Sequence, residues 1–144
     1  MKKLLFLAIT VLVVTITSCS KDDDNRFEGT WTLTQMESGT DLTRLSTVDL
    51  TDCDKKTTVT FSGNDFVFNG FGYDRQNNCV ETIETATFSY TDTTLNVKDV
   101  LTKVENTVSY TIIGNLLTVL YERTEKDNDG AEVKHYTKTI YTKK

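Results

Sequence analysis

From Phe27 to the end of the chain, apolar and polar side chains alternate in short runs, and turn-favouring residues separate one run from the next. Alternation over about four to eight residues is typical of a strand with one buried face. Threonine, valine and aromatic residues dominate these runs, and such side chains pack well on a pleated sheet. The pattern predicts an all-β domain without a long helix, made of eight strands: 29–37, 57–61, 65–71, 81–90, 94–98, 106–113, 116–123 and 132–141.

The connections between these strands come in two lengths. Three are tight turns, at 62–64, 91–93 and 114–115, and the Gly and Asn residues in two of them suit the left-handed conformations of hairpins. The other four are longer: 38–56, 72–80, 99–105 and 124–131. In an up-and-down meander alternate connections lie at opposite ends, so tight turns form a base and long loops form a mouth. We therefore expect an eight-stranded antiparallel up-and-down barrel, filled by side chains or holding one small ligand.

The parity of residues along each strand predicts which side chains face the barrel interior. On the first strand, Trp31, Leu33 and Gln35 share one parity. Tyrosines combine an apolar body with a polar tip, which suits a wet pocket, but they serve equally as cross-strand partners on the outer face. The residues predicted to line a ligand site are Gln35, Val59, Phe71, Tyr110, Tyr121 and Tyr136. Parity does not assign Tyr136 to a face, because the last strand lacks clean alternation.

The start of the chain has the features of an export signal. Lys2 and Lys3 precede an apolar run of signal-peptide length, which is shorter than the ~20 apolar residues of a membrane span. Ser18 and Cys19 follow, and together these features resemble the bacterial lipobox, in which the cysteine is acylated. The alternative is an ordinary cysteine after a conventional cleavage site. The resemblance divides the chain into a signal peptide (1–18), a lipidated acidic tether (19–26) and a barrel domain (27–144).

The tether carries a second signal. Lys21 is followed by three aspartates, 22–24, and this run is too solvated to pack. It resembles the export signal of Bacteroidota lipoproteins, which sends them to the outer leaflet of the outer membrane. We therefore expect a lipid-anchored protein of the outer membrane at the cell surface, with the periplasmic face, or a tether without an address, as alternatives. Residues 20–26 span at most ~25 Å when extended, so the domain would lie close to its bilayer.

Charge and composition exclude several functions. The chain has 144 residues and a net charge of −5, or −7 once the two lysines of the leader are removed (−5 − 2), which argues against nucleic acid as a partner. There is no glycine-rich phosphate loop and no metal-ligand cluster, and no nucleophile is placed to use His135 as a base. The protein is therefore not expected to be an enzyme or to carry a cofactor.

Two cysteines remain after the leader, Cys53 and Cys79, each at the end of a long loop. In an exported chain two cysteines most simply form a disulfide, and a zinc site would need more ligands than they and His135 provide. The loop 125–130 resembles the opening of a calcium-binding EF-hand loop. Its twelfth position is Tyr136 rather than glutamate, so a polar hairpin loop is the better interpretation.

Gly29, Thr30 and Trp31 resemble the Gly-x-Trp signature that opens the first strand of lipocalins. With the long first loop, the cysteine pair and the tight turn after residue 61, the chain is similar to lipocalin-like lipoprotein domains of Bacteroidota. The resemblance implies that Trp31 plugs the closed base of the barrel. One feature departs from the family: the arginine often set against this tryptophan has no clear equivalent, since Arg123 lies towards the mouth and the last strand offers only Lys138.

These observations lead to two functional hypotheses. The first is a membrane-anchored barrel that binds a small apolar ligand. The alternative is a barrel filled by its aromatic residues, whose rim loops bind a protein or a glycan, and a rim loop presented to a protease is a further variant. The triplet 92–94 also matches the short Asp-Thr-x pattern that Bacteroidota glycosylate, a match that arises easily by chance in a threonine-rich chain.

Overall fold

The structure is a computed structural model that describes residues 26–144. The expected signal peptide, the lipidated Cys19 and nearly all of the tether lie outside the described residues. Nine strands and one short 3₁₀ helix follow in order: β1 (Gly29–Gly39), β2 (Ser46–Val48), η1 (Asp54–Lys56), β3 (Thr58–Ser62), β4 (Asp65–Tyr73), β5 (Cys79–Tyr90), β6 (Thr94–Asp99), β7 (Glu105–Ile113), β8 (Leu116–Lys126) and β9 (Glu132–Lys143). In this part of the chain no helix is long and apolar enough to cross a membrane.

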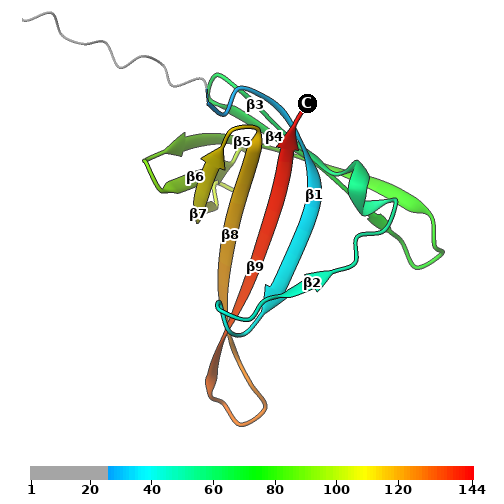
Figure 1. Ribbon diagram of the computed structural model, residues 1–144, viewed down its shortest axis with the longest axis vertical. Coiled ribbons are helices and arrows are strands. Elements are labelled where there is room, and N and C mark those ends of the chain that lie inside the picture. The colour runs from blue at the N-terminus through cyan, green and yellow to red at the C-terminus, as the bar shows by residue number, and fades with distance from the viewer. Residues whose placement is uncertain (1–25) are drawn as a thin grey trace, which may run out of the picture.

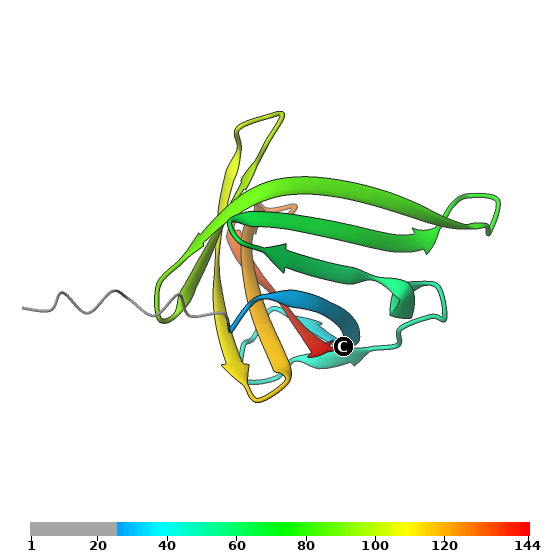
Figure 2. The ribbon, with the colours of Figure 1, turned by 90° about the horizontal axis from the view of Figure 1, so that it is seen from above.

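All strand pairs are antiparallel, and β1 closes the sheet by pairing with both β3 and β9. The result is the expected closed eight-stranded barrel, in which each predicted strand has an observed counterpart. Figure 1 shows β8, β9 and β1 side by side along one wall, and Figure 2 shows how the strands curve round. The ninth strand, β2, lies within the segment 38–56 that is predicted as a long loop, and it pairs with the end of β1. Its three residues are too few to show an alternating pattern.

One end of the barrel, the base, is closed by the tight turns. Gly63 and Gly114 adopt positive φ angles of 57° and 59° in the β3–β4 and β7–β8 turns, which a residue with a Cβ would rarely accept. At the opposite end, the mouth, the longer hairpin loops project, as the β8–β9 hairpin does in Figure 1 and the β4–β5 hairpin in Figure 2. The described chain begins at the base, where Arg26 lies over the ring of Tyr90.

The base is filled by a cluster that we call the base core. Its buried members are Phe27, Trp31, Leu33, Val59, Phe61, Leu95, Tyr110, Leu117 and Tyr141. Trp31 is fully buried, and its indole N–H donates a hydrogen bond of 2.7 Å to the carbonyl of Phe27. The ring of Phe27 in turn packs on those of Phe61 and Tyr110, at centroid distances of 5.0 and 4.8 Å. The segment before β1 therefore closes the base of the barrel with the aromatic side chain of Phe27.

The cation that lies against Trp31 is Lys143. Its Nζ lies 5.1 Å from the centre of the Trp31 ring, at the distance of a cation–π contact. The expectation that the last strand offers only Lys138 was wrong, because β9 runs two residues beyond its predicted end and pairs Lys143 with Trp31. Lys138 instead faces outward, where it forms an ion pair with Glu37.

A β-bulge in β1 reverses the expected parity of its second half. The pairing with β9 shifts register between Leu33 and Gln35, which leaves Thr34 without a partner in the register. As a result Met36 packs on the base core, whereas Gln35 turns to the outer face and donates a hydrogen bond to Glu37. The prediction that Gln35 shares the inner face of Trp31 and Leu33 was therefore wrong.

The wall next to β1 is incomplete, because β3 has only five residues and its pairing with β1 and β4 ends at Thr58. Beyond that point, β2 and η1 occupy the place of a longer strand. Thr57 connects this segment to β1 and β4: its carbonyl accepts a hydrogen bond from the N–H of Leu33, and its hydroxyl accepts one from the N–H of Phe71.

The predicted disulfide is confirmed and links Cys53, before η1, to Cys79 at the start of β5.

Candidate functional site

A cavity of about 570 Å³ opens above the base core, and we call it the mouth cavity. Residues from β1, β4, β5 and β9 line it together with the β2–η1 segment. They are Leu33, Met36, Val48, Leu50, Asp54, Thr57, Phe68, Gly70, Phe71, Gly72, Tyr73, Val80, Thr82, Glu84 and Tyr141. Its volume lies in the range of about 300–1,000 Å³ that is typical of small-molecule sites.

Two glycines on the inner face of β4 keep this cavity open. Phe66 and Phe68 pack towards the core, and the register of β4 runs without a break, so Gly70 and Gly72 share their face. A Cβ at Gly70 would come within 2.6 Å of the Phe68 ring, which shows that the ring lies against this bare backbone. A Cβ at Gly72 would meet nothing within 4 Å. Side chains at both positions would project into the open space of the cavity.

The floor of the mouth cavity is apolar. Leu33 and Tyr141 belong to the base core, and Met36 and Phe68 pack on it from the cavity side. Burial raises the pKa of the Tyr141 phenol above its ordinary value, so this hydroxyl stays neutral over the whole physiological range. A ligand that reaches the floor therefore meets hydrocarbon, sulfur and aromatic surface without a charge.

Two carboxylates, those of Glu84 and Asp54, are among the groups that line the mouth cavity. Glu84 lies directly across the ladder from Phe68, and Thr82 from Gly70, so both side chains face inward. Asp54, on η1, accepts hydrogen bonds from the hydroxyl and the N–H of Thr51, at 2.6 and 2.9 Å. These bonds hold the pKa of Asp54 below its usual value, and this carboxylate is therefore charged at neutral pH.

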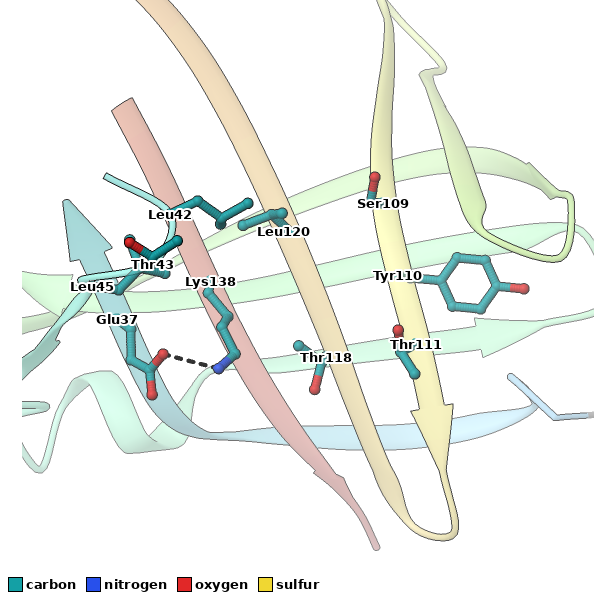
Figure 3. A pocket seen from close by; sticks show the side chains of 10 residues that line it. All are labelled: Glu37, Leu42, Thr43, Leu45, Ser109, Tyr110, Thr111, Thr118, Leu120 and Lys138. Carbon is teal, nitrogen blue, oxygen red and sulfur yellow. Dashed lines mark hydrogen bonds and ion pairs between the residues drawn. The ribbon is translucent and has the colours of Figure 1, made fainter. Parts of the chain in front are cut away.

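A second hollow of about 510 Å³, the outer groove, lies on the outside of the barrel. Figure 3 shows the residues that line it: Glu37, Leu42, Thr43, Leu45, Ser109, Tyr110, Thr111, Thr118, Leu120 and Lys138. The strand registers place four of them in one row, since Lys138 pairs with both Glu37 and Leu120, and Leu120 pairs with Ser109. Within this groove the two charged groups satisfy each other, at 2.9 Å from Lys138 Nζ to Glu37 Oε2.

Three of the predicted ligand-site residues lie on the inner side of the barrel or at its mouth. Phe71 lines the mouth cavity. Val59 is buried in the base core, below the cavity. Tyr121 pairs with Thr137 on the inward parity of β8, but its side chain is exposed and does not line the cavity.

The other three lie away from the mouth cavity. Tyr110 is buried in the base core, where its hydroxyl donates a hydrogen bond of 2.6 Å to the carbonyl of Thr91, and its ring points away from the outer groove in Figure 3. Gln35 faces outward after the β-bulge, beside Glu37. Tyr136 pairs with Gly39 and shares the outward parity of Lys138. The structure therefore does not bring the six predicted residues together.

Most residues that line the cavity are not predictable from the sequence pattern, for two reasons. The bulge places Met36 rather than Gln35 on the inner face, and Val48 and Leu50 belong to the predicted long loop 38–56. Gly70 and Gly72 did carry a usable signal. Glycines at alternate positions leave one face of a strand bare, and this face continues the aromatic one of Phe66 and Phe68.

The loop considered for calcium is stabilised by its own side chain. Asp127 Oδ1 accepts hydrogen bonds from the N–H groups of Asp129 and Ala131, and this oxygen atom therefore faces the loop backbone. Across residues 26–144, no three His, Cys, Asp or Glu side chains are grouped so as to hold a metal ion. His135 lies 3.6 Å from Glu125 on an exposed part of the β8–β9 hairpin.

Comparisons with known proteins place this chain in a family. A family model described as a lipocalin-like domain matches residues 27–143. No curated protein matches the chain significantly, whereas six chains of solved structures do. One of these is apocrustacyanin C1, which is 13% identical, with a TM-score of 0.46 over 87% of this chain. The present chain spans 64% of the length of that protein.

Proposed function

Because the chain belongs to the family of lipocalin-like domains, we propose that its barrel binds a small, mainly apolar molecule in the mouth cavity. One observation carries this proposal: a cavity of about 570 Å³ lies between an apolar floor and an open mouth. Burial of apolar ligand surface is favourable by roughly 25 cal/mol per Å², so the floor formed by Met36 and Phe68 supplies the main driving force. Carriage or sensing of the ligand, rather than its chemical conversion, fits such a floor.

The location of the protein is part of the same proposal. Acylation of Cys19 would anchor the chain in the outer membrane, and the run Lys21–Asp24 would direct it to the cell surface. The described chain starts at the base, where Phe27 packs in the base core. An anchor joined to this point by a tether of at most ~25 Å would hold the base near the lipid and turn the mouth towards the medium. A ligand could then enter without crossing the anchor.

A fluorescence titration with N-phenyl-1-naphthylamine, a neutral apolar probe, tests the binding function. The purified protein should enhance the probe's emission, and added decanol should reverse the effect by competition. In the variant Gly72→Leu the new side chain would fill open space in the cavity, and we expect probe affinity to fall by about tenfold or more, equivalent to ~1.4 kcal/mol. Folding should not suffer, because a strand glycine is itself unfavourable by roughly 0.5–1 kcal/mol relative to alanine.

The matched control is Thr85→Leu. Thr85 is exposed on β5 and pairs with Val67 on the outward parity, so the same apolar group is added to the other side of the wall. This variant should bind the probe as the wild type does. Equal binding by wild type and Gly72→Leu would contradict the proposal. It would favour the rim-loop alternative, for which Leu101, 87% exposed at the tip of the β6–β7 loop, is the first contact residue to test.

A further inference from the structure

The charged groups that line the mouth cavity indicate which class of ligand it would bind. We infer that the cavity selects a cationic amphiphile, an amine with an alkyl or aromatic body, over a carboxylate of the same size. The inference rests on the proposed binding function and specifies which end of the ligand faces the mouth. Its apolar body would lie on the floor formed by Leu33, Met36 and Phe68, and its ammonium group beside Glu84.

Glu84 is positioned to contact such a head group while the body reaches the floor. Cross-strand partners have Cβ atoms about 4.5–5.5 Å apart, and the register places Glu84 opposite Phe68 on the inner face. The carboxylate therefore lies next to the apolar floor rather than at a distant rim. Within residues 26–144 Glu84 belongs to no ion pair, so its carboxylate is available to a ligand.

Asp54, on η1, adds a second negative charge to the lining of the mouth cavity. Its two hydrogen bonds from Thr51 favour the charged form of the carboxylate. They also fix its position, so no rearrangement is needed when a cation enters. A ligand carboxylate in the same cavity would face like charges from both Glu84 and Asp54 and would find no ammonium or guanidinium group among the residues that line it.

Neither Lys55 nor Arg123 lines the mouth cavity, and each of them forms an ion pair with another carboxylate. Lys55, next to Asp54, pairs with Asp52 at 3.5 Å and lines a separate outer hollow with Thr34 and Gln35. Arg123, on the inward parity of β8, pairs with Glu125 at 3.0 Å and does not line the mouth cavity. The overall net charge of −5 reinforces the same preference at longer range.

The test compares three ligands of equal chain length: decylammonium, decanol and decanoate. Each competes with N-phenyl-1-naphthylamine for the purified protein at neutral pH and low salt. We expect affinity to fall in the order cation, alcohol, anion. Exposed ion pairs are worth a factor of up to about five, and repulsion of the anion acts in the same sense, so decylammonium should bind about tenfold more tightly than decanoate.

The variant Glu84→Gln should reduce this preference. We expect the affinity for decylammonium to fall and the affinity for decanoate to rise, while the affinity for decanol stays unchanged. The matched control is Glu81→Gln on the same strand. Glu81 is also exposed, but it pairs with Phe71 on the outward parity and does not line the mouth cavity. The variant Glu81→Gln removes the same net charge as Glu84→Gln and should leave the order and the ratio of the three affinities as in the wild type.

The outcomes separate the inference from the function on which it rests. Decanoate binding as tightly as decylammonium, or equal effects of the two glutamine variants, would overturn the amine preference and leave ligand binding intact. Failure of all three ligands to displace the probe, with Gly72→Leu still binding it, would instead remove the proposed function. High salt should reduce the preference for the cation and not the affinity for decanol, since salt screens exposed charges.

Discussion

The base and the mouth of this barrel are built from the same strands but differ in how tightly their side chains pack. In the base, ring packs on ring: Phe61 lies within about 5 Å of the ring centres of Phe27 and Phe88, and Trp31 is fully sealed. In the mouth the inner face of β4 changes from phenylalanine to glycine, and the space above Phe68 stays open. A change of side-chain volume along one strand thus divides a stabilising plug from an open hollow.

The largest difference between the two ends should appear in the cost of removing an aromatic ring. Phe61→Ala would leave a void among packed rings, and we expect a loss of about 3–5 kcal/mol of unfolding free energy. Phe68→Ala removes a half-buried ring that borders the mouth cavity, and its cost should be only about 1–2 kcal/mol. Urea unfolding of both variants measures the difference, and equal losses would contradict the division between a packed base and an open mouth.

The disulfide should produce a somewhat smaller effect, confined to the mouth. Cys53 and Cys79 are 26 residues apart, and closure of such a loop stabilises a protein by about 3 kcal/mol in the chain-entropy model. The double variant Cys53→Ala with Cys79→Ala should lose about this amount in urea unfolding, as should the reduced wild type. Loss of the disulfide removes the covalent link between the β2–η1 segment and β5. Because this segment lines the mouth cavity, the affinity for the probe should fall as well.

The environment of Trp31 provides the internal control for this variant. Trp31 lies in the base core, away from the disulfide, and its near-ultraviolet circular dichroism in the absence of urea should be that of the wild type. A loss of this signal in the folded double variant would mean that the disulfide also organises the base, which would break the proposed separation of the two ends.

Much of the barrel could be predicted from the sequence because its signals are local. Alternation marked most of the eight barrel strands, and glycines marked the turns at Gly63 and Gly114. The disulfide followed from cysteine number and the expected export. The family resemblance implied a plug at the base, and the structure has Trp31 fully buried there.

The site was harder to predict because it depends on interruptions of the pattern. The bulge at Thr34 carries no glycine to mark it, yet it exchanges Gln35 for Met36 on the inner face. The β2–η1 segment fills a gap that exists only because β3 is shorter than its neighbours, which is a property of the closed sheet. The contact of Lys143 with Trp31 likewise depends on how far β9 continues.

Amide hydrogen exchange of the protein, free and saturated with decylammonium, tests the central claim most directly. The account predicts slower exchange on ligand binding around the mouth cavity, in β4 from Gly70 to Tyr73 and in β5 from Val80 to Glu84, with unchanged exchange around Trp31 and Phe61. Slower exchange confined to the outer groove, around Leu42 and Lys138, or to the base core would contradict it.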